Sequence, residues 1–70
     1  MLSKESPIGK IIDKETNGQG VGYYYPEEFK LVVHFIGATE EQTKRLLLLI
    51  QNHIDLKGLW RSFDNILIMR

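Results

Sequence analysis

The stretch FKLVVHFIGATEEQTKRLLLLIQNHIDLKG (residues 29–58) decides the fold, because a strand pattern in it is followed directly by a helix pattern. Aromatic and β-branched side chains alternate between two faces over residues 29–36, which is typical of a β-strand. One face is wholly apolar, with Phe29, Leu31, Val33 and Phe35. The opposite face is mixed, with Lys30, Val32, His34 and Ile36.

A helix is predicted from about Glu40 to about Lys57. Thr39 stands at the N-cap position with Gln42 three residues later, which is the pattern of a capping box. Gly58 is a typical residue for the position after a helix C-terminus. The helical period gathers one apolar stripe, which we expect to face the sheet: Leu46, Leu47, Leu49, Ile50, His53 and Ile54.

Outward from this stretch, the sequence predicts three further strands, in residues 8–14, 21–25 and 63–69. The Asn17-Gly18 pair favours a hairpin loop over residues 15–20, and Pro26 begins a turn. The predicted fold is a small single α+β domain over residues 1–70 in the order β-β-β-α-β. We expect one sheet of about four strands, with one helix packed on one face and residues 1–7 flexible. The crossover through the helix predicts that the last strand is parallel to a strand of the same sheet.

Composition narrows the class of protein. The chain has 70 residues with nine basic and nine acidic side chains, and it has no cysteine. A formal net charge of zero argues against nucleic-acid binding driven by bulk positive charge. The absence of a long apolar run leads us to expect a cytoplasmic protein without membrane contact.

The sequence offers no constellation for catalysis, so we expect no enzyme activity, no cofactor and no metal site. The two histidines, His34 and His53, have no spacing that would bring them together with a carboxylate. The glycines of residues 18–22 precede a predicted strand, whereas a phosphate-binding loop opens a helix.

An interaction surface is the stronger hypothesis. Leu48 falls on the polar side of the predicted helix, and residues 66–69 are apolar on both faces, although one helix covers only one face of a sheet. The second face therefore needs the N-terminal segment, another copy of the chain or a partner protein. We expect a regulatory, homodimeric module that occludes or scaffolds a protein partner. Its candidate interface residues are Leu48, Gln51, Asn52, Trp60, Arg61, Leu67 and Met69.

A single-stranded nucleic-acid-binding protein is the alternative hypothesis. Three consecutive tyrosines with nearby cations could stack on bases. The candidate surface for that function is Lys10, Tyr24, Lys30, His34, Arg61 and Arg70.

The predicted order of elements over residues 8–69 is similar to that of the small HicB-like antitoxin domain. The resemblance implies a further alternative, an antitoxin-like inhibitor of a small enzyme. The chain carries Tyr25-Pro26-Glu27-Glu28-Phe29 where that family has an Asp-Leu-Pro-Gly segment, so no residue roles are transferred.

Overall fold

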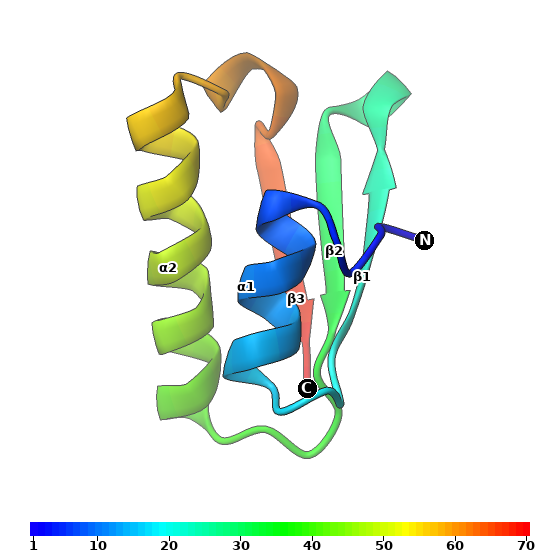
Figure 1. Ribbon diagram of the computed structural model, residues 1–70, viewed down its shortest axis with the longest axis vertical. Helices are drawn as coiled ribbons and strands as arrows, with labels where there is room; N and C mark the ends of the chain where they lie inside the picture. The colour runs from blue at the N-terminus through cyan, green and yellow to red at the C-terminus, as the bar shows by residue number, and fades with distance from the viewer.

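A computed structural model describes all residues 1–70 as two helices packed on one side of a three-stranded sheet (Figure 1). The elements are α1 (Pro7–Glu15), β1 (Val21–Tyr25), η1 (Pro26–Glu28), β2 (Lys30–His34), α2 (Glu40–Lys57), η2 (Trp60–Ser62) and β3 (Asn65–Met69). The strand order is β1-β2-β3, with β1 antiparallel and β3 parallel to β2. The α+β class and the parallel last strand are confirmed, but the sheet has three strands instead of about four.

The predicted first strand is wrong, because residues 7–15 form α1. Ser6 caps this helix by accepting a hydrogen bond from the Gly9 N–H (3.1 Å), and Pro7 occupies the first turn, where a missing N–H costs nothing. Ile8 and Ile12 lie one turn apart and are both buried. The predicted hairpin loop therefore connects a helix to β1, with Asn17 and Gly18 at the positive φ expected of such residues.

The pairing of β1 with β2 follows a regular register in which Tyr23 lies opposite Val32. Leu31 and Val33 are fully buried beneath the helices, as their alternation predicted. Phe29 departs from this pattern. It ends η1 in a left-handed conformation (φ 50°), before β2 begins, and remains 49% exposed instead of joining the inner face.

The predictions for α2 are confirmed at both ends. The Gln42 N–H donates to Thr39 Oγ1 (3.1 Å) and Gln42 Oε1 accepts from the Thr39 N–H (2.8 Å), which completes the capping box. At the other end Gly58 adopts φ 65° and the Leu59 N–H donates to the Ile54 carbonyl oxygen, as in a Schellman motif.

The core lies between the helices and one face of the sheet. α1 packs against β1 and α2, and α2 packs against β3. Both helices, β2 and the residues that follow β2 and η2 contribute to one buried cluster: Ile8, Ile12, Leu31, Val33, Phe35, Leu46, Ile50, Ile54 and Phe63. Neither helix combines the length and apolar character that a bilayer-spanning segment requires.

The observed order α-β-β-α-β also removes the basis of the resemblance to the HicB-like antitoxin domain. That resemblance rested on three strands before the helix, and the first of them is α1. β3 begins at Asn65, two residues later than predicted, because residues 60–62 form η2 and Phe63 follows it into the core.

Candidate functional site

The side of the sheet that faces away from the helices is the candidate functional surface, and we call it the open face. Each strand contributes every second residue to it, as the register requires. Its nine side chains are Val21, Tyr23, Tyr25, Lys30, Val32, His34, Asn65, Leu67 and Met69.

The centre of the open face is a row of three apolar side chains, one from each strand. Tyr23 pairs with Val32, and Val32 pairs with Leu67. Val32 is only 8% exposed because its neighbours on both sides cover it, whereas Leu67 is 49% exposed. The Tyr23 ring also contacts the His34 ring edge-on, with 5.1 Å between the ring centres. The row is therefore a preformed apolar strip whose β3 end lies open.

The open face carries positive charge and no negative charge. Lys30 is its only fully charged residue, and none of its nine residues is a carboxylate. His34 adds a ring that can donate a hydrogen bond, and Tyr25, 46% exposed, lies directly opposite Lys30 in the register. The open face therefore combines an apolar centre with hydrogen-bond donors at its margin.

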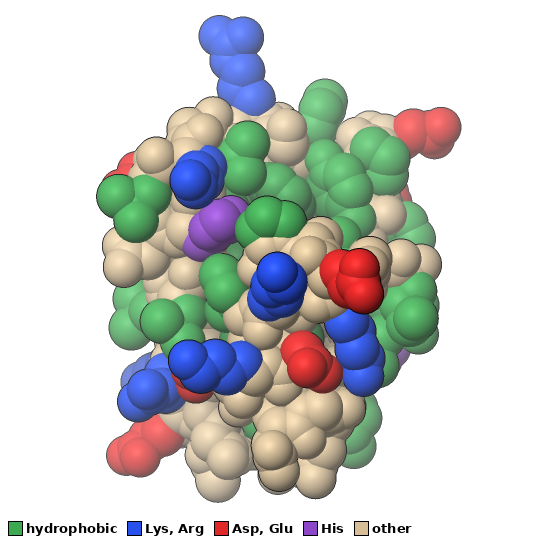
Figure 2. Space-filling model, viewed as in Figure 1, with side chains coloured by type: hydrophobic (Ala, Val, Ile, Leu, Met, Phe, Trp, Pro, Cys, Tyr) green, Lys and Arg blue, Asp and Glu red, His purple; other side chains and the backbone are tan.

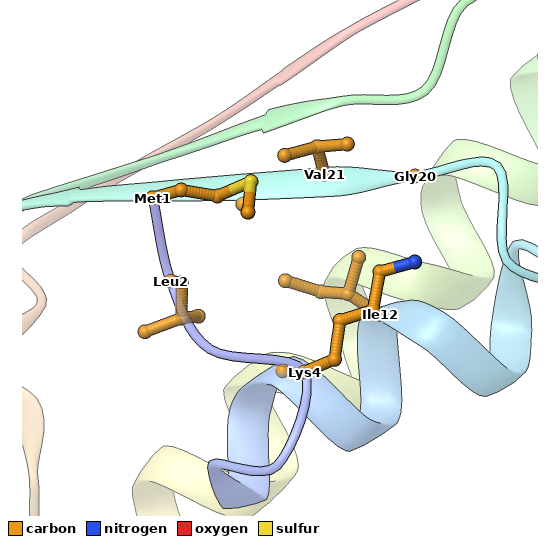
Figure 3. A pocket seen from close by; sticks show the side chains of 8 residues that line it. Met1, Leu2, Lys4, Ile12, Gly20 and Val21 are labelled. Atoms are coloured by element: carbon orange, nitrogen blue, oxygen red, sulfur yellow. The ribbon is translucent and has the colours of Figure 1, made fainter.

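The N-terminal segment does not cover the open face, although it was one of the three expected covers. The Leu2 N–H donates to the Gly22 carbonyl oxygen (2.7 Å), so this segment runs along the outer edge of β1. The Leu2 side chain packs against the helix-side core (Figure 3). The space left between Leu2, Ile12 and Gly22 is a cavity of about 10 Å³, which is at the lower limit for one water molecule.

The predicted interface residues fall on three separate parts of the molecule. Leu67 and Met69 lie together on the open face and are 49% and 43% exposed. Leu48, 65% exposed, lies on α2 together with Gln51 and Asn52, and only Gln51 is half-buried. Trp60 and Arg61 belong to η2, where the Trp60 Nε1–H donates to Asp55 Oδ1 (3.1 Å).

The residues of the alternative nucleic-acid surface are also dispersed. Lys30 and His34 lie on the open face, but Tyr24 points to the helix side of the sheet. There its ring packs on Phe63 and its hydroxyl donates to the Ser62 carbonyl oxygen (2.9 Å). Lys10 is on α1, Arg61 is on η2 and Arg70 follows β3. These side chains do not form one surface.

Sequence reasoning placed only Leu67 and Met69 of the open face in the interface. It omitted all three β1 residues, Val21, Tyr23 and Tyr25, together with Val32 and Asn65, and it named Lys30 and His34 only for the alternative nucleic-acid surface. Alternation alone places Tyr23 and Tyr25 on one face of a strand. It does not show that this face is the one that Leu67 and Met69 share, because that depends on the strand order and register.

The surfaces outside the open face have no comparable apolar row and no metal-binding cluster. Charged side chains of both signs are scattered over the helices, and hydrophobic side chains gather near η1 (Figure 2). An apolar hollow of about 170 Å³ at one end of α1 and α2 is lined in part by half-buried His53 and Leu59 and by buried Phe63. No group of three His, Cys, Asp or Glu side chains is placed to hold a metal ion.

Comparison with known proteins finds no matching family model, no matching curated protein and no matching solved structure.

Proposed function

We propose that the chain is a non-enzymatic, homodimeric module that binds a protein partner through the open face and thereby occludes or scaffolds it. One observation carries the proposal: apolar and aromatic side chains from all three strands form a continuous surface that no part of the chain covers. Tyr25, Leu67 and Met69 are each 43–49% exposed on it. Contiguous apolar surface rimmed by polar groups is typical of protein interaction sites.

The partner is a protein surface with an apolar centre and acidic groups at its margin. The apolar row of Tyr23, Val32 and Leu67 supplies the desolvated centre, and tyrosine is a residue type common at binding hot spots. Lys30 lies beside this row without a carboxylate on the same face, so an acidic group of the partner would pair with it.

A photocrosslinking experiment tests the proposal. A photoreactive benzoylphenylalanine replaces Tyr25 on the open face or, as the control, Leu56 on α2, which is 80% exposed. The chain is irradiated in cells that produce it. We expect a discrete protein adduct from position 25 and none from position 56, and we expect the second change Lys30→Glu to abolish the adduct.

Three outcomes would overturn the proposal. They are equal adducts from both positions, an adduct at position 25 that the Lys30→Glu change leaves intact, and crosslinking at position 25 to nucleic acid instead of protein. Circular dichroism of each variant checks that the fold is unchanged.

A further inference from the structure

The outer edge of β3 is free, and its hydrogen-bonding groups point away from the sheet. In a parallel pair, alternate residues bond to the neighbouring strand. The Asn65 N–H donates to the Phe29 carbonyl oxygen (3.1 Å), and the Met69 carbonyl oxygen accepts from Phe35 (2.8 Å). Asn65, Leu67 and Met69 therefore bond inward, and the main-chain groups of Ile66 and Ile68 point outward. No turn, loop or cap hydrogen bond of the chain reaches them.

We propose that this edge pairs with the β3 edge of a second copy of the chain, antiparallel and around a twofold axis at Leu67. Ile66 of each copy would lie opposite Ile68 of the other, and each such pair exchanges two main-chain hydrogen bonds. The two sheets join into one continuous sheet. This inference specifies the homodimer named in the proposed function, and its test uses the chain alone.

Charge complementarity selects the register. Asp64 and Arg70 stand immediately before and after β3. With Leu67 opposite Leu67, Asp64 of each copy lies opposite Arg70 of the other at both ends of the ladder. The two neighbouring registers place Asp64 opposite Ile68, or Arg70 opposite Ile66, and both lose the two charge pairs. Opposite charges across a strand pair stabilise it, whereas a charge facing an isoleucine does not.

Both faces of the edge suit contact with a second copy. On the open face Leu67 and Met69 are about half exposed. On the helix side, Ile68 borders a groove of about 200 Å³ with Thr43, Lys44 and Leu47 of α2. Pairing through β3 would bring the α2 helices of the two copies side by side over the joined sheet, with Leu47 between them.

The exposed area is about a tenth larger than the average for a monomeric protein of this mass. The chain exposes 4937 Å², whereas a monomeric protein of 8.1 kDa exposes about 4500 Å². The excess of about 440 Å² is roughly half of the ~800 Å² that each partner buries in a standard interface. A free, apolar edge strand of this kind is otherwise a site of aggregation, which proteins avoid with charges or by covering the edge.

Light scattering on four forms of the chain tests the pairing. The wild type is expected at about twice the chain mass of 8.1 kDa. Leu67→Lys and Leu67→Asp each place like charges opposite one another at the twofold axis. We expect each to weaken the dimer at least tenfold, and an equimolar mixture of the two to restore it. Tyr25→Lys, which lies on the open face but two strands from this edge, should leave the dimer unchanged.

Each opposite result overturns the proposal. A wild type that stays at 8.1 kDa at all concentrations, or Leu67 variants that remain dimeric, would exclude the edge. A mixture that stays monomeric would exclude the register. Dissociation by Tyr25→Lys would show that two open faces pack together instead. None of these results depends on the protein partner, so failure of this proposal is distinguishable from failure of the proposed function.

A conservative variant guards against loss of the fold. The chain has no cysteine, so a disulfide formed by Leu67→Cys joins two copies. Directly opposite residues of a non-hydrogen-bonded antiparallel pair have Cα atoms about 4.5 Å apart, which a disulfide can span. We expect Leu67→Cys to form a covalent dimer at least tenfold faster than the control Leu56→Cys on α2. Equal rates would contradict the pairing.

Discussion

The two edge strands of the sheet differ in how much of their outward main chain is hydrogen-bonded. At β1 the outward carbonyl oxygen of Gly22 accepts the Leu2 N–H, and the Leu2 side chain packs against the core. At β3 the outward groups of Ile66 and Ile68 have no such cover, although the strand is wholly apolar after Asn65. β1 is covered at the Gly22 carbonyl oxygen alone, since no hydrogen bond reaches the outward main-chain groups of Tyr24, whereas the outward groups of β3 are uncovered along the whole strand.

The largest effect is expected from a substitution at Gly9 of α1, because it would displace the N-terminal segment that covers Gly22 of β1. A Cβ added there would overlap the carbonyl oxygen of Ser3 and crowd Ser6 Oγ, so the N-terminal segment would have to move off α1 and β1. We expect Gly9→Ala to lower the free energy of unfolding by about 1–3 kcal/mol, as overpacking does. Denaturant unfolding measures it, with exposed Lys14→Ala as the control, expected within about 0.5 kcal/mol of wild type. A gain in stability, usual for Gly→Ala in a helix, would contradict the close packing.

A smaller effect is expected from Leu2, whose side chain packs against the core and holds the N-terminal segment beside β1. Full burial of a leucine contributes about 1.5–3 kcal/mol, and Leu2 is only partly buried. We expect Leu2→Ala to cost about 1 kcal/mol in unfolding free energy. Met1→Ala is the matched control, because Met1 is 82% exposed and should cost less than about 0.5 kcal/mol. Equal costs would mean that the N-terminal segment does not hold β1.

The smallest effect on the single folded chain is expected at the free edge. Leu67 is 49% exposed, so Leu67→Ala should lower the free energy of unfolding by only about 0.5 kcal/mol in dilute protein. The melting temperature should therefore change little. In concentrated protein the wild type should melt higher, because dimerisation stabilises the folded state by mass action, and Leu67→Ala should gain less. Differential scanning calorimetry over a concentration series measures both. A wild type whose melting temperature does not change with concentration would contradict the pairing.

The sequence predicted α2, its caps and all three strands because their signals are local. Thr39 and Gln42 cap the start of the helix and Gly58 ends it, so the residue types themselves mark its bounds. The wrong prediction of a strand over residues 8–14, where the structure has α1, has a physical reason as well. Two adjacent isoleucines, Ile11 and Ile12, suggested a strand through their β-branched side chains. The Ser6-Pro7 start and the spacing of Ile8, Ile11 and Ile12 at i, i+3 and i+4 are the helical signals that prevail.

The open face was predictable only in part. Apolar residues on both faces of residues 66–69 indicated an uncovered side, and Leu67 and Met69 lie on it. Joining them to Tyr23 and Tyr25 requires the strand order and register, which are long-range properties that no local pattern encodes. Which edge is free also depends on the Leu2–Gly22 hydrogen bond, which sequence alone does not reveal.

Amide hydrogen exchange at β3 tests the central claim most directly. The Leu67 N–H points toward β2 and should exchange slowly in dilute and in concentrated protein. The N–H groups of Ile66 and Ile68 point outward, so we expect them to exchange rapidly in dilute protein and to become protected as concentration rises and two copies pair. Rapid exchange of Ile66 and Ile68 at every concentration, with Leu67 still protected, would contradict the account.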